Sequence, residues 1–169
     1  VSLLVQGVGD GSQPLVSRYH GQKDTRAVLQ TRKLAYGTAG VLAVLCMVGL
    51  YAVRGRIGPV LGASAATAEN VARVLPVFLS SYLFLAFSRV TTAAFYATEK
   101  VGYSYTLVYI EPLLQVLLLS FLPRSMGMGQ VGVWWTMPLA QILTAAVAAV
   151  LKIQTDRGTA QAVERDPSP

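Results

Sequence analysis

Three ionisable residues interrupt long apolar stretches of this 169-residue chain: Asp10, Arg89 and Glu111. A charged side chain at the centre of a bilayer costs about 2.5 to 3.5 kcal/mol on insertion scales, so such residues usually have a function or a charged partner. Carboxylates in this setting bind protons, metal cations or cationic substrates, or they pair with basic side chains. The two carboxylates and the arginine are therefore the first candidates for chemistry.

Asp10 precedes Gln13 by three residues, so the two side chains share one face of a helix. Pro14 lacks an N–H, and its ring crowds the carbonyl four residues earlier, which belongs to Asp10. A carboxylate, a freed carbonyl and an amide offer the oxygen ligands that hard cations prefer. The pattern predicts a coupling-ion or proton site, or a contact to a cationic substrate. The alternatives are that Asp10 lies near external water or pairs with a basic residue on a helix outside this chain.

Glu111 is followed directly by Pro112, and Gln115 lies one turn further along the same helix face. Pro112 frees the carbonyl of Val108 and is expected to kink the helix. A carboxyl group in a low-dielectric environment binds a proton more readily than it does in water, which would suit a proton-coupled carrier. The alternative is an ion pair with a nearby arginine such as Arg89 that serves packing only.

Arg89 shares a seven-residue spacing with Tyr82 and Tyr96, so the three side chains fall on one helix face. It lies eight residues before Ala97, about 12 Å from the expected cytoplasmic end of its helix. Its long side chain can reach part of that distance toward water. Because an arginine repels any cation that binds nearby, we expect Arg89 to have a structural role.

These residues must be positioned by membrane helices, each of which needs about 20 mainly apolar residues. The segments that qualify are residues 34–53, 74–98, 103–123 and 130–151. Residues 1–17 are predicted to be the last part of a fifth transmembrane helix. Alternation with period two is absent, so the sequence predicts an all-α membrane protein and not a barrel. Pro138 frees the carbonyl of Trp134 and is a third candidate hinge beside Pro14 and Pro112.

The polar segments between the apolar ones predict the topology. We expect a basic cytoplasmic loop at residues 18–33, an external loop at 54–73 and a polar cytoplasmic tail at 152–169, disordered on composition. Nine Lys and Arg residues fall on one predicted side of the membrane and four on the other. The excess of basic residues places the first loop and the C-terminus in the cytoplasm, and five spans then place the N-terminus outside.

The composition excludes several function classes. Only 13% of the residues are charged, about half the usual share in a soluble domain. A single cysteine, Cys46, excludes a disulfide framework, and a single histidine, His20, leaves no zinc site and no histidine-based catalysis. No phosphate-binding loop and no nucleophile–base pair are visible, so we expect neither an enzyme nor a cofactor. The basic loop lacks interleaved aromatic residues, so its expected partner is the anionic membrane lipids, not nucleic acid.

The stretch at residues 7–22, GVGDGSQPLVSRYHGQ, resembles a signature of the multidrug and toxic compound extrusion (MATE) transporters. In that family a helix bearing Gln-Pro-Leu runs into a basic cytoplasmic loop through a glycine. Residues 59–66, PVLGASAA, resemble the family's external loop, and residues 132–139, GVWWTMPL, resemble the start of its last helix. Arg18 and His20 depart from the small or neutral polar residues that are usual there, so the subfamily stays open.

The resemblance implies the last five of twelve helices, in an antiporter with two six-helix lobes around a central cavity. It also implies a plasma-membrane exporter of organic cations or amphipathic compounds, driven by sodium ions or protons and working by alternating access. Because the chain starts with Val, inside a helix, we expect a piece of a longer protein. That piece would be inactive without its N-terminal lobe. The alternatives are a lipid-linked saccharide flippase, which should have a cationic cavity although only Arg89 is well placed for it, and a non-transporting scaffold.

Overall fold

The computed structural model describes residues 1–62, 64–125 and 129–165, and every element within these ranges is an α-helix. The helices are α1 (Ser2–Gly21), α2 (Thr25–Ala52), α3 (Arg54–Val60), α4 (Ala65–Ala97), α5 (Val101–Ser125) and α6 (Gly129–Arg165). Four of them, α2, α4, α5 and α6, are long and apolar enough to cross a membrane, whereas α1 is not among these candidates. The prediction of an all-α membrane fold is confirmed.

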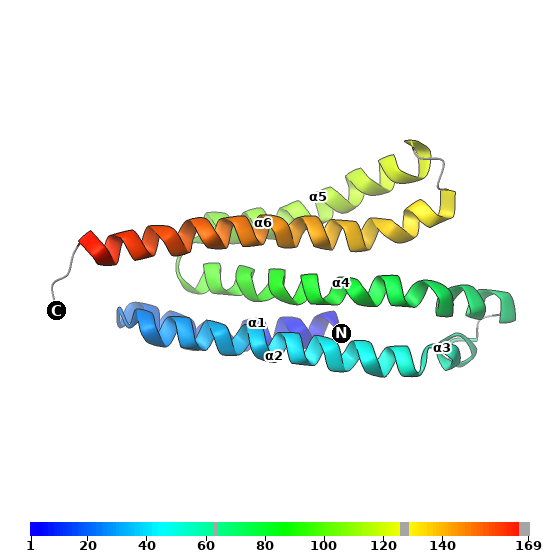
Figure 1. Ribbon diagram of the computed structural model, residues 1–169, viewed down its shortest axis with the longest axis horizontal. Coiled ribbons are helices and arrows are strands. Elements are labelled where there is room, and N and C mark those ends of the chain that lie inside the picture. Colours follow the sequence, from blue (N-terminus) through cyan, green and yellow to red (C-terminus); the bar gives the residue numbers. More distant parts are fainter. Residues whose placement is uncertain (63, 126–128, 166–169) are drawn as a thin grey trace.

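Helix α4 is the centre of the bundle, because it contacts every other helix. Helices α1, α2 and α3 pack on one side of it, and α5 and α6 pack on the other, as Figure 1 shows. The backbones of α1 and α2 do not approach those of α5 and α6. Helix α4 therefore provides the backbone packing between the two halves of the bundle.

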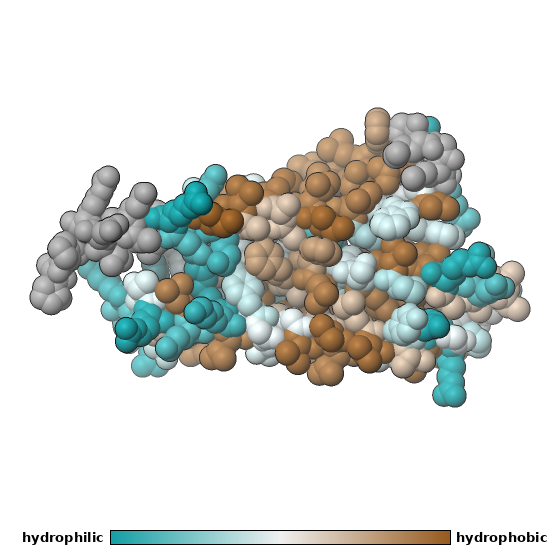
Figure 2. Space-filling view, in the orientation of Figure 1, coloured by the Kyte–Doolittle hydropathy of each residue, from teal (hydrophilic) through white to brown (hydrophobic). Residues whose placement is uncertain are grey.

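The packing of α2 is typical of a membrane helix. Its buried positions include Ala35, Ala39 and Ala43, spaced by four residues, so small side chains face the neighbouring helices. Its large apolar side chains point outward, and Leu34 is 72% exposed. Lipid solvates leucine as well as a protein core does, so membrane helices associate through small residues that let backbones approach closely. Apolar residues accordingly cover the middle of the face shown in Figure 2.

Two glycines mark close contacts between helices. A Cβ atom on Gly9 would lie 3.4 Å from the Cβ of Ala93, so α1 lies close against α4. A Cβ atom on Gly58 would overlap both Cα and Cβ of Ala68, so α3 packs directly against the first turn of α4. The absence of a side chain at Gly9 and Gly58 therefore lets α1 and α3 pack close to α4.

The helices extend further into the polar segments than the sequence predicted. Within the predicted cytoplasmic loop at 18–33, only residues 22–24 are non-helical, because the Asp24 carboxylate accepts a hydrogen bond from the N–H of Ala27 (2.9 Å) and starts α2 there. The predicted external loop at 54–73 contains α3 and the first turns of α4, which begin after Ser64. These helix ends are set by capping side chains and not by the loss of apolar character.

The predicted polar tail also differs from the expectation. Helix α6 continues from the apolar segment through Arg165, so residues 152–165 are helical, and residues 166–169 lie outside the described ranges. One reason is local, since Lys152 and Asp156 form an ion pair of 2.7 Å (Nζ to Oδ2) one turn apart. The prediction of a disordered tail from polar composition is therefore wrong for residues 152–165, which continue α6.

Candidate cation site at the contact of three helices

Glu111 lies where α4, α5 and α6 meet. Its Oε2 atom is 3.2 Å from Nη2 of Arg89 on α4, and the same guanidinium nitrogen lies 3.4 Å from Oε1. From the other side, Nε2 of Gln141 on α6 donates a hydrogen bond of 2.8 Å to Oε1. The carboxylate of α5 is therefore held by one cation and one amide, each from a different helix.

The cluster is largely shielded from solvent. The side chain of Glu111 is 14% exposed and that of Arg89 is 33% exposed, while Gln141 is fully buried. Removing two charges from water is costly, and their mutual attraction repays the cost only when further hydrogen bonds complete the geometry. Gln141 supplies such a bond. The structure thus shows the Arg89–Glu111 pair that the sequence offered as the alternative to a free carboxyl group.

Two buried oxygen atoms beside this cluster have no hydrogen-bond partner among the described residues. They are Oε1 of Gln141 and Oγ1 of Thr144, which lie three residues apart on one face of α6. A buried polar atom without a partner costs about 1 to 3 kcal/mol, so such atoms often mark a place for water, an ion or a ligand. The sequence reasoning missed Gln141, although an amide within an apolar span was a signal that could have found it.

The other residues predicted for this site are placed less centrally. Gln115 is half-buried one turn after Glu111, but it makes no hydrogen bond with Glu111 within the described part of the chain. The three candidate hinges, Pro14, Pro112 and Pro138, each lie inside a continuous helix. A proline in these positions removes one backbone hydrogen bond without ending the helix.

Asp10 and Gln13 face each other on α1, as their spacing predicted. Nε2 of Gln13 lies 3.4 Å from Oδ1 of Asp10, and the carboxylate is exposed. Nearby, the hydroxyl of Ser12 donates a hydrogen bond to the carbonyl of Gly9 (2.7 Å). No ion pair among the described residues involves Asp10. Since α1 and α5 are separated by α4, the structure does not bring Asp10 and Glu111 into one site.

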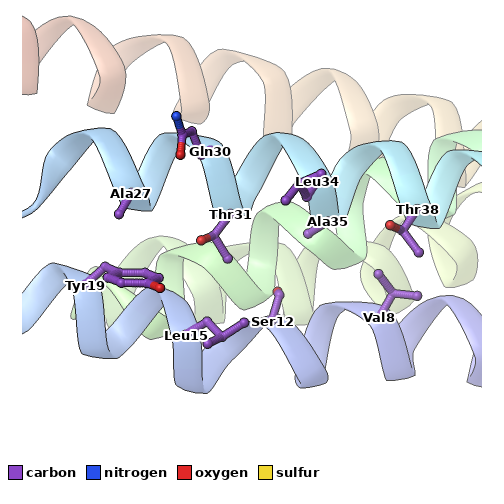
Figure 3. A pocket seen from close by; sticks show the side chains of 10 residues that line it. All are labelled: Val8, Ser12, Leu15, Tyr19, Ala27, Gln30, Thr31, Leu34, Ala35 and Thr38. Atoms are coloured by element: carbon purple, nitrogen blue, oxygen red, sulfur yellow. The ribbon is translucent and has the colours of Figure 1, made fainter.

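A groove of about 440 Å³ lies between α1 and α2 (Figure 3). Its polar side chains are uncharged, and they come from both helices: Ser12, Tyr19, Gln30, Thr31 and Thr38. Neither Asp10 nor Glu111 lines it. The groove can form hydrogen bonds with a polar molecule, but it carries no charge that would attract a cation.

Comparison with known proteins was made at the level of family, sequence and structure. The family model MatE matches residues 1–122, a range that includes Asp10, Arg89 and Glu111. No curated protein matches the chain. The similar solved structures include the inward-facing conformation of a multidrug resistance MATE family transporter of the MOP superfamily and a crystal structure of a MATE mutant.

Both structures share the fold of the chain at low sequence identity. Each has a TM-score of 0.80 and 17% identity over 88% of this chain, and the match covers 34% of the first structure and 33% of the second. The chain thus spans about one third of the length of either. Together with the family match over residues 1–122, the all-α architecture shows that this chain belongs to the MatE family of multi-pass membrane proteins.

Proposed function

We propose that the chain is part of a secondary active efflux transporter that exports organic cations or amphipathic compounds in exchange for sodium ions or protons. Membership of the MatE family supports this, as does the likeness to a structure described as a multidrug resistance transporter. Because the chain spans about one third of the similar structures, further helices would complete the cavity, and the chain alone would not transport. By the distribution of basic residues, the end with the α1–α2 turn faces the cytoplasm of a plasma-membrane protein.

The observation that carries this proposal is the shared carboxylate of Glu111. A cation that reaches Glu111 would replace Arg89 as the counter-charge, and Arg89, which is one-third exposed, would turn away from the carboxylate. The carboxylate of Glu111 would then have a counter-charge in both states, and the charge of Arg89 would need a new partner when the cation binds. Only one cation can occupy the carboxylate at a time. The exit of one cation is therefore coupled to the entry of the other, as an exchanger requires.

The unpartnered oxygen atoms would supply ligands for a metal cation. Oε1 of Gln141 and Oγ1 of Thr144 are oxygen donors of the type that a sodium ion would use together with Glu111. A proton would need Glu111 alone. Asp10 and Gln13 on α1 form the second, separate contact for a coupling ion or a cationic substrate.

Transport by the complete protein in proteoliposomes tests this proposal. Uptake of ethidium is followed by fluorescence after a pH gradient or a sodium gradient is imposed, in the wild type, Glu111→Gln and the exposed control Glu69→Gln. We expect Glu111→Gln to lose about 90% or more of gradient-driven uptake, because an amide can neither bind a proton nor supply a negative charge. The control should keep its uptake. Wild-type rates in Glu111→Gln would overturn the proposal, and the gradient that drives the wild type identifies the coupling ion.

A further inference from the structure

A cavity of about 670 Å³ lies at the end of the bundle where α1 turns into α2 and α4 turns into α5. Four basic side chains line it: His20, Lys23, Arg32 and Lys100. Asp156 is the acidic residue among the lining residues. In Figure 1 both turns lie toward the end of the bundle that carries the C-terminal part of α6, and hydrophilic residues gather there in Figure 2. The cavity contains neither Asp10 nor Glu111, so it is separate from the candidate cation sites.

Arg32 has more hydrogen-bond donors than the surrounding protein satisfies. Its Nη1 atom pairs with Oδ1 of Asp156 at 3.2 Å, but its Nε and Nη2 atoms are buried without a partner among the described residues. Asp156 is itself shared, because Lys152 binds its other oxygen at 2.7 Å. One carboxylate thus serves two cations. A largely buried guanidinium with two unused N–H groups can bind further acceptors, and carboxylate or phosphate oxygens are its strongest partners.

The ammonium group of Lys100 is destabilised by partial burial and by the positive charge of Arg32. Burial lowers the pKa of Lys100 below its usual 10.5, the positive charge of Arg32 lowers it further, and the attraction of Asp156 does not offset both effects. Two cations that repel each other inside a partly enclosed space are stabilised when an anion enters between them. The unused donors of Arg32 and the nearby positive charge of Lys100 both favour an anion in this cavity.

We propose that this cavity binds a phosphate group through Arg32 and Lys100, with Lys23 and His20 at its margin. A guanidinium forms two parallel hydrogen bonds to phosphate oxygens, and an ammonium group contributes a point charge. The volume is in the range of small-ligand sites, about 300 to 1,000 Å³. The phosphate would come either from the headgroup of an anionic lipid or from a soluble phosphate ester.

Binding would also affect the link between two helices. The backbones of α2 and α6 do not approach each other, and the ion pair of Arg32 and Asp156 joins them across the cavity. A phosphate held by Nε and Nη2 of Arg32 leaves Nη1 to Asp156, but the negative charge of the phosphate repels that carboxylate. Occupation of the cavity would therefore loosen the α2–α6 link while relieving the repulsion between Arg32 and Lys100.

The first test measures thermal unfolding of the complete protein in an uncharged detergent, with inorganic phosphate titrated against chloride at constant ionic strength. The variants are Arg32→Gln and Lys100→Gln, and the matched control is Arg26→Gln, an exposed arginine of α2 that does not line the cavity. We expect saturable stabilisation of the wild type and the control, with an apparent affinity about tenfold or more weaker in both cavity variants. Without phosphate, Lys100→Gln should melt above the wild type, because the repulsion is gone.

The second test identifies the source of the phosphate. Nanodiscs of phosphatidylcholine with or without phosphatidylglycerol are compared, and retained lipid is counted by native mass spectrometry for the same four proteins. Retention of phosphatidylglycerol that requires Arg32 and Lys100, without an effect of inorganic phosphate, indicates a lipid headgroup. The reverse result indicates a soluble ester, and both effects together indicate that the phosphate group itself suffices. If neither ligand depends on Arg32 and Lys100, the proposal is wrong.

Discussion

Nη2 of Arg89 lies 3.2 Å from Oε2 of Glu111, and this ion pair joins α4 to α5 between two apolar segments. The other carboxylate oxygen accepts a hydrogen bond from Gln141 on α6, so the carboxylate of Glu111 links α4, α5 and α6. Breaking such a pair leaves a poorly solvated charge, which costs more than replacing both partners by neutral groups. Substitutions at Arg89 and Glu111 should therefore not act independently.

We expect Arg89→Met to lower the free energy of unfolding by about 1 to 3 kcal/mol, less than for a fully buried pair because Arg89 is one-third exposed. Adding Glu111→Gln to Arg89→Met should recover most of that loss, since no charge is then left unpaired. A double-mutant cycle, measured by thermal or denaturant unfolding in mild detergent, gives the coupling free energy. Strictly additive effects would show that the two side chains do not interact.

Asp10→Asn should abolish drug resistance conferred by the complete protein while leaving its level in the membrane unchanged. The exposed carboxylate on α1 makes no ion pair among the described residues, so its removal should not disturb the fold. Asp24→Asn is the matched control, because asparagine also caps a helix and the α2 start should persist. Growth assays in the presence of the drug and immunoblots of membranes measure the two outcomes. Full resistance with Asp10→Asn would remove Asp10 from the mechanism.

The lowered pKa of Lys100 predicts how the stability of the protein depends on pH. Its pKa is lowered in the folded protein, so the folded state binds fewer protons than the unfolded state just below pH 10.5. Stability from this group therefore rises as the pH increases toward 10.5. Subtracting the melting curve of Lys100→Met, measured over the same pH range, isolates this contribution. The exposed Lys33→Met is the control and should leave the rise intact; identical pH profiles for the wild type and Lys100→Met would contradict the burial of Lys100.

Gly58→Ala should destabilise the contact of α3 with α4, because the added Cβ would overlap Ala68. Overpacking of this kind costs about 1 to 3 kcal/mol. Gly55→Ala is the matched control in the same helix, where an added Cβ meets nothing within 4 Å. That control should be neutral or stabilising, since alanine favours helix more than glycine does. Equal melting temperatures for the two variants would show that α3 does not pack closely against α4.

The sequence predicted the membrane helices because length and lack of charge are one-dimensional properties. Residues 34–53 and 74–98 correspond closely to the apolar parts of α2 and α4. The helix ends were less predictable, because the Asp24 cap and the pairing of Lys152 with Asp156 extend helices into polar segments. A loss of apolar character marks where a helix would leave the lipid, not where the helix ends.

For the candidate sites, the sequence likewise predicted contacts within one helix better than contacts between helices. The spacing of Asp10 and Gln13 predicted their proximity, since both lie on one helix. The Arg89–Glu111 pair spans two helices and was foreseen only as one alternative. Gln141 could have been singled out as an amide within an apolar span, but its contact with Glu111 could not be predicted, because the sequence does not show which face of α6 turns toward α5. The basic cavity likewise forms only when α1, α2, α4 and α6 are packed together.

Equilibrium binding of an organic cation tests the central claim most directly, namely that Glu111 is a carboxylate for which cations compete. The complete protein in detergent is titrated with ethidium at several pH values and sodium concentrations, and binding is followed by fluorescence anisotropy. We expect wild-type affinity to fall when protons or sodium ions increase, and Glu111→Gln to bind about tenfold or more weakly with no response to either ion. Wild-type affinity and wild-type ion response in Glu111→Gln would contradict the account.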